Sequence, residues 1–123
     1  MARKDEFLDY VLDQMAFIHG LNARAMFGGY GLYQDELIFA LIIDDMLYLK
    51  VDDATQSEFE AKGLRPFGYA ARGRTVTMRY HEAPAEVFED IDEMRYWTNK
   101  ALQAALASNA KKSSKGRRRP DKA

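Results

Sequence analysis

The chain has 123 residues and a formal net charge of −1, with 47% hydrophobic residues, 30% charged residues and no cysteine. This length and composition suit one domain with one hydrophobic core. The lack of cysteine excludes disulfides, thiolate metal sites and thiol catalysis, and is typical of a reducing compartment. No apolar run reaches the roughly 18–20 residues of a membrane helix and the N-terminus has no secretory signal pattern, so we expect a cytoplasmic protein without membrane contact.

The charges are distributed unevenly along the chain. Of 18 basic and 19 acidic residues, seven basic and one acidic residue lie in positions 111–123, which leaves 11 basic and 18 acidic residues in positions 1–110. The body of the chain is therefore acidic and its C-terminal segment is basic, so the two parts are expected to behave differently.

The N-terminal half predicts one helix followed by strands. Apolar residues at helical spacing indicate an amphipathic helix over residues 5–18, with Asp5 as its N-cap and Gly20 beyond its end. Between residues 24 and 51 the apolar pattern changes to that of strands. We expect three antiparallel strands there, the last two joined by a turn at Asp44-Asp45.

The C-terminal half predicts a helix, a hairpin and a long helix. Asp53 and Gln56 have the spacing of a capping box, so a short helix is expected to run to Lys62 and to end before Gly63. Residues 67–71 and 75–80 form a second hairpin in this interpretation. Pro84 is typical of a first helical position, and the helix after it is expected to reach about residue 107.

The order of these elements predicts an α+β fold. Consecutive hairpins with helices between them favour a two-layer structure, in which an antiparallel five-stranded sheet carries the helices, in the order α-β-β-β-α-β-β-α. We expect residues 1–108 to form this domain. Residues 109–123 are rich in Lys, Arg, Ser and Gly and predict a basic, disordered tail.

The residue types that carry catalysis do not combine into a site. The cluster Gly28-Gly29-Tyr30-Gly31 is followed by more strand rather than by a helix, which favours a tight turn or bulge over a phosphate-binding loop. The strand at 46–51 separates the pair Asp44-Asp45 from the next acidic pair by roughly 20 Å. His19, at a helix end, and His81, in a predicted loop, have no partner for metal binding or acid–base work. We therefore expect no enzyme activity, no metal and no cofactor.

The segment Glu36–Ile43 is apolar at both alternating sets of positions, which is unusual for a half-exposed antiparallel strand. One set, which consists of Leu37, Phe39, Leu41 and Ile43, faces the helices in our interpretation. The other set, with neighbours on the next strands, is covered either by another part of the chain or by a partner. Aromatic and Arg residues around an apolar centre are typical of an interface. The predicted interface residues are Ile38, Ile42, Met46, Tyr48, Lys50 and Arg79.

The basic tail is a second candidate for binding. Clustered cations suit the phosphate backbone of nucleic acids through counterion release, without reading of sequence. Solvation of the tail or its docking on the acidic body are the alternatives. The predicted nucleic-acid contacts are Lys111, Lys112, Lys115, Arg117, Arg118 and Arg119.

Several stretches together resemble the N-terminal domain of the TfoX/Sxy family, which regulates competence genes in bacteria. The resemblance runs from about residue 5 to residue 107 through Phe27-Gly28-Gly29-Tyr30-Gly31-Leu32-Tyr33, Phe39-Ala40-Leu41-Ile42, Leu47-Tyr48-Leu49-Lys50-Val51-Asp52, Pro66-Phe67-Gly68-Tyr69, Met78-Arg79-Tyr80, Pro84, Glu89-Asp90, Trp97, Ala101, Ala104 and Ala105. It implies a single-domain member with a fold similar to bacterial secretion chaperones and a regulatory rather than enzymatic role.

Two hypotheses follow from the sequence. The first is a non-enzymatic regulatory or adaptor module that binds a protein partner through the sheet, with the transcription machinery or a second copy in a homodimer as candidate partners. The alternative is a nucleic-acid-associated accessory factor that contacts nucleic acid weakly through the basic tail.

Overall fold

A computed structural model describes residues 6–26, 28–71 and 74–121, with the side chains of 69–78 and 109–121 left out. The chain begins with α1 (Glu6–Gln14) and continues with four strands, which are β1 (Leu21–Met26), β2 (Gly29–Gln34), β3 (Leu37–Ile43) and β4 (Met46–Lys50). It then forms α2 (Asp53–Ala61), β5 (Pro66–Ala71), β6 (Arg74–Glu82), the 3₁₀ helix η2 (Ala85–Phe88) and α3 (Ile91–Asp121).

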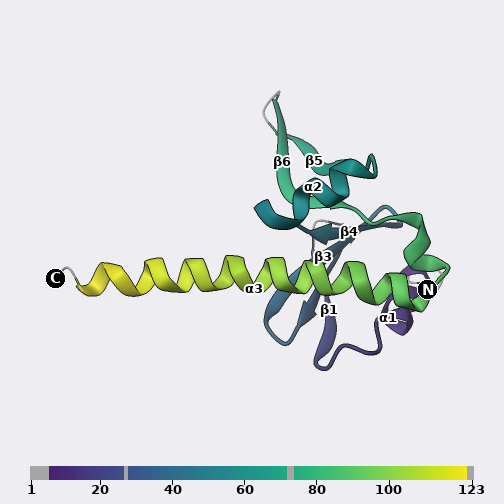
Figure 1. Cartoon of the computed structure of the whole chain (residues 1–123), viewed down its shortest axis with the longest axis horizontal. Helices are drawn as coiled ribbons and strands as arrows, with labels where there is room; N and C mark the ends of the chain where they lie inside the picture. Colours follow the sequence, from purple (N-terminus) through teal and green to yellow (C-terminus); the bar gives the residue numbers. More distant parts are fainter. Residues whose placement is uncertain (1–5, 27, 72–73, 122–123) are drawn as a thin grey trace.

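The strands form one antiparallel sheet in the order β1-β2-β3-β4-β6-β5 (Figure 1). The predicted α+β class is confirmed, but the described sheet has six strands rather than five. The additional strand arises because Gly28, with φ at +77°, folds the segment around it into a hairpin of β1 and β2. The prediction of a turn with positive φ at this glycine cluster is thereby confirmed.

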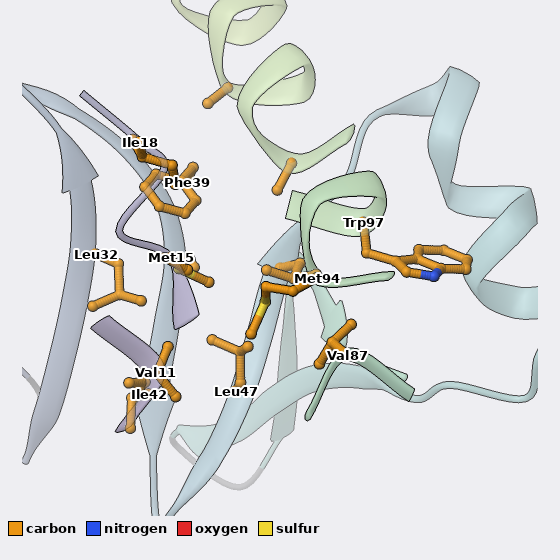
Figure 2. Close-up of a cluster of buried hydrophobic side chains, with 14 of the residues drawn as sticks. Val11, Met15, Ile18, Leu32, Phe39, Ile42, Leu47, Val87, Met94 and Trp97 are labelled. Carbon is orange, nitrogen blue, oxygen red and sulfur yellow. The ribbon is translucent and has the colours of Figure 1, made fainter. Parts of the chain in front are cut away.

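The three helices pack on one face of the sheet, where they enclose the hydrophobic core. Figure 1 shows α3 lying across the sheet, and Figure 2 shows side chains from α1, the sheet and α3 meeting in the core. Buried members of this cluster come from each layer: Val11 from α1 and Met15 just after it, Leu32, Phe39, Ala40, Ile42, Leu47 and Leu49 from the sheet, Phe59 from α2, and Met94, Trp97, Ala101 and Ala105 from α3.

A bulge in β3 explains why this strand is apolar at successive positions. Leu32 of β2 pairs with Ala40 while Tyr33 pairs with Ile38, so Phe39 has no partner on β2. Phe39 and Ala40 are both fully buried in the core. The bulge therefore shifts the alternation by one residue within the strand. The core face holds Ile42 after the bulge, and Ile38 lies on the opposite face.

Two local predictions are corrected at the helices. The capping box of α2 joins Asp52 and Thr55, because the Asp52 carboxylate accepts from the Thr55 amide at 2.9 Å and the Thr55 hydroxyl accepts from the Asp52 amide at 3.0 Å. The predicted pair Asp53 and Gln56 is one residue out of place. Beyond Pro84 the chain forms the short η2 first, and the long helix begins only at Ile91.

The helix α3 continues to Asp121, through the segment for which the composition predicts a disordered tail. Ala, Lys and Arg, which have high helix propensity, occupy seven of the 13 positions from 109 to 121, whereas Gly116 and Pro120 have the lowest propensity. Within the described part of the chain, none of the helices is both long enough and apolar enough to cross a membrane.

Candidate functional site: the open face of the sheet

The face of the sheet opposite the three helices is called the open face here. Strand pairing defines it, because residues directly opposite on neighbouring strands share a face. Leu41 pairs with Gly31 and with Tyr48, and Lys50 pairs with Tyr80. The side chains of this face are Arg24, Met26, Tyr33, Ile38, Leu41, Ile43, Met46, Tyr48, Lys50, Phe67, Tyr80 and Glu82.

Gly31 lets neighbouring side chains close over the centre of the open face. A Cβ atom at this position would lie 2.7 Å from the Met26 sulfur and 2.9 Å from Ile38 Cδ1. These side chains occupy the space that any other residue would need. Leu41, opposite Gly31, is consequently only 1% exposed although no described helix packs on this side.

Aromatic rings lie around this centre, and two of them have a cation over the ring. The Arg24 guanidinium lies 4.1 Å from the ring centroid of Tyr33, and the Lys50 ammonium lies 5.0 Å from that of Tyr80. The ring of Tyr48 meets that of Phe67 edge to face, with centroids 4.9 Å apart. Such cation–ring contacts and tilted ring pairs each contribute roughly 0.5–1.5 kcal/mol. They hold the side chains of the open face in a defined arrangement.

Tyr48 and Tyr80 of the open face stay neutral at physiological pH, because the pKa of each phenol is raised above its ordinary value. Burial raises the pKa of Tyr80 to about 12, and the nearby Tyr33 adds to this shift. Burial also raises the pKa of Tyr48, with further contributions from the carboxylates of Glu82 and Asp44. Both phenols therefore act as neutral hydrogen-bonding groups, and the charge of the face comes from its Arg, Lys and carboxylate groups.

The open face combines buried, half-buried and exposed apolar groups. Leu41 and Tyr80 are buried, Ile38 and Tyr48 are half-buried, and the Met46 side chain is 39% exposed at one end of β4. An apolar and aromatic centre with charged groups of both signs around it is the composition typical of protein interfaces.

The structure divides the six predicted interface residues between the two sides of the sheet. Four of them, Ile38, Met46, Tyr48 and Lys50, lie on the open face. The placement of Ile42 there is wrong, because Ile42 pairs with Leu47 and is buried in the core.

Arg79 is likewise turned away from the open face, since it precedes Tyr80 and successive strand residues alternate. Its guanidinium binds the Asp53 carboxylate at 2.9 Å, close to the start of α2.

The sequence reasoning missed eight residues of the open face, namely Arg24, Met26, Tyr33, Leu41, Ile43, Phe67, Tyr80 and Glu82. For two of these residues, Tyr33 and Tyr80, the alternation of side chains along the strand was a usable signal. Tyr33 is two residues from Gly31 and shares its side of β2, and Tyr80 alternates with Arg79. Choosing the correct set required the register between strands, which the sequence does not give.

The other residues considered from the sequence are the histidines, the possible metal ligands and the basic residues near the C-terminus. His81 lies in β6 rather than in a loop; it is buried, and its Nδ1 donates to the Leu64 carbonyl oxygen at 2.9 Å. Among the residues that the structure describes, there is no group of three or more His, Cys, Asp or Glu side chains that could hold a metal ion. The basic residues predicted to contact nucleic acid lie on the C-terminal part of α3, and their side chains are outside those described.

An open groove of about 480 Å³ lies where α3 leaves the body. It is lined by Lys50, Val51, Asp52, Asp53, Ala54, Arg79, Ala107 and Ser108. Because Asp53 already binds Arg79, the groove offers a mixture of paired charges and small apolar groups. It marks the end of the contact between α3 and the rest of the domain.

The fold and its site define a two-layer α+β domain with helices on one side of the sheet and an aromatic, partly charged face on the other. The chain belongs to the TfoX N-terminal domain family, whose pattern matches residues 13–105. It is 32% identical over 68 residues to the DNA transformation protein TfoX1 of Aliivibrio fischeri, which is 55% of this chain and 32% of that protein. It is 23% identical over 105 residues to the protein Sxy of Escherichia coli, which is 85% of this chain and 50% of that protein. The chain thus spans between about a third and a half of the length of these relatives.

Proposed function

We propose that this chain is a non-enzymatic regulatory domain of the competence type, and that it acts by binding another protein through the open face. Membership of the TfoX N-terminal domain family supports the regulatory role, as does the similarity to a protein named for DNA transformation. The observation that carries the binding mechanism is the open face itself, since it presents ordered apolar and aromatic groups on the side away from all three described helices.

The chemistry of the open face favours a partner of a particular kind. Its centre offers apolar and aromatic surface, and Arg24 and Lys50 lie on its tyrosine rings. A partner segment with apolar side chains flanked by carboxylates complements this arrangement, because its acidic groups approach the two cations while its apolar groups cover Met46 and Ile38. A second copy of the chain fits the open face only if carboxylates on its own surface reach Arg24 and Lys50.

A complementation experiment tests this proposal. In a strain whose own copy of the gene is deleted, the wild-type chain should restore transformation with added DNA. The variants Met46→Glu and Lys50→Glu should lower the transformation frequency at least about tenfold, because each places a carboxylate on the apolar or cationic part of the face.

The matched control is Leu106→Glu, which changes a side chain that is 56% exposed on α3 and outside the open face. It should transform as the wild type does. Circular dichroism should show the same fold for all three variants, and light scattering should report whether the wild type is a dimer that the open-face variants dissociate. Normal transformation by both folded open-face variants would exclude the open face as the binding site.

A further inference from the structure

The C-terminal part of α3 extends beyond the body of the domain. Among the residues of α3 whose side chains the structure describes, the last buried ones are Ala104 and Ala105, and Ser108 lines the groove where the helix leaves the body. Figure 1 shows the C-terminal part of α3, in yellow, standing clear of the sheet and the other helices. The 13 residues from 109 to 121 add about 20 Å of helix at 1.5 Å per residue.

The sequence places most of the basic residues of this extension at positions that share one face of the helix. Five of them follow the spacing i, i+1, i+4, i+7 and i+8, which places residues on one face of an α-helix. We call this set the basic stripe; it consists of Lys111, Lys112, Lys115, Arg118 and Arg119. Arg117 lies outside it. Basic residues that serve only to solvate a tail have no reason to follow this helical spacing.

We propose that the basic stripe binds duplex DNA through its phosphates, without reading the base sequence. A stripe of five cations over about 12 Å of helix can neutralise several phosphates, which follow one another at 3.4 Å along each strand. The B-form major groove, about 12 Å wide, admits an α-helix, whereas the deep and narrow major groove of duplex RNA does not. The geometry therefore favours DNA.

The acidic body of the chain repels DNA, but the shape of α3 keeps the basic stripe away from that body. The helix holds the basic stripe beyond the body, and its far end lies more than one Debye length, about 8 Å in physiological salt, from the last body contact. Because α3 is one continuous helix to Asp121, this part of the chain points away from the acidic body (Figure 1).

A membrane is the less suitable anionic partner. An interfacial helix needs large apolar side chains opposite its cations. The remaining positions from 109 to 116 are Asn109, Ala110, Ser113, Ser114 and Gly116, which are small or polar. They offer no apolar face for insertion between lipids.

Fluorescence anisotropy with a labelled 30-base-pair duplex of mixed sequence, at several NaCl concentrations, tests the proposal on the full chain. The wild type should bind, and the logarithm of its affinity should fall against the logarithm of salt with a slope of about −4 to −5. In the variant K111Q/K112Q/K115Q/R118Q/R119Q, the slope should approach −1 and the affinity at the lowest salt should fall at least about a hundredfold.

A second variant separates the helical face from net charge. K111S/S113K/S114K/K115S keeps the composition and the total charge but spreads the cations, at positions 112–114 and 117–119, around the helix, and its affinity should fall at least about tenfold. Circular dichroism should give equal helix content for all proteins. Met46→Glu should bind DNA as the wild type does, because this inference does not depend on the open face.

Three results would overturn the inference: no binding of the duplex by the wild type, equal binding by the rearranged variant, or binding of phosphatidylserine vesicles in place of DNA. Self-association through the basic stripe without DNA binding would assign the stripe to the acidic body of a second copy instead.

Discussion

At the scale of single residues, the turn between β3 and β4 determines what each face of the sheet contains. Asp44 and Asp45 both have positive φ, at 51° and 60°, as a two-residue type I′ turn requires. Such a turn pairs Ile43 with Met46, so the following pair, Ile42 and Leu47, points to the opposite side. The sequence correctly predicted a turn here. The interface prediction also needed the register between β3 and β4, and the two-residue length of the turn fixes that register.

Tyr80 gives the open face a pH-dependent contribution to stability. Its pKa in the folded protein is about 12, above the ordinary value of 10 that applies when the chain is unfolded. A group whose proton is held more tightly in the folded state stabilises the fold fully below pH 10 and loses this contribution between pH 10 and 12. The loss in free energy of unfolding should be on the order of 2 kcal/mol over that interval.

Urea unfolding between pH 9 and pH 12 measures this effect, with Tyr80→Phe as the control. The phenylalanine variant keeps the buried ring but has no phenol to titrate, so its stability should fall less steeply in this range. Parallel curves for the two proteins would show that Tyr80 ionises as easily in the folded as in the unfolded state.

At the scale of elements, α2 depends on its first turn. Asp52 and Thr55 satisfy two backbone amides between them, and Glu58 then connects the helix to α3 by accepting from Lys100 at 2.8 Å and from the Tyr96 hydroxyl. Phe59 enters the core, where its ring meets that of Trp97 with centroids 5.0 Å apart. The cap therefore fixes the start of a helix that completes one end of the core.

Removal of this cap should have a measurable cost. Asp52→Ala is expected to lower the free energy of unfolding by about 1 kcal/mol, because an N-terminal amide of the helix loses its acceptor. Asp53→Ala should cost no more than about 0.5 kcal/mol, since its ion pair with Arg79 is exposed to solvent. Chemical denaturation of both variants compares them directly, and equal losses would mean that Asp52 does not act as the cap.

At the scale of the whole molecule, the two sides of the sheet should respond differently to charge. Ile42→Glu introduces a carboxylate into the core and should lower the free energy of unfolding by at least about 4 kcal/mol, which leaves little folded protein. Met46→Glu, on the open face, should stay within about 0.5 kcal/mol of the wild type. Near-ultraviolet circular dichroism and urea unfolding distinguish these outcomes, and a folded Ile42→Glu variant would contradict the assignment of the core face.

The sequence alone determined the α+β class, the order of the helices and most strands, the turn at Asp44-Asp45 and the resemblance to the family to which the chain belongs. These features depend on local spacing, on turn residues and on composition, each of which can be recognised within a few neighbouring positions. Of the residues predicted for an interface, Ile38, Met46, Tyr48 and Lys50 lie together on one face of the sheet, and the interface itself stays a prediction.

Only the tertiary structure decided which face of the sheet the helices cover. Alternation within a strand defines two sets of side chains but does not say which set lies inside, and the unpaired Phe39 exchanges the two sets part-way along β3. That choice depends on hydrogen bonds between strands distant in the sequence and on the volume available beneath the helices. For the same reason Ile42 belongs to the core, while Tyr33 and Tyr80, from separate hairpins, both lie on the open face.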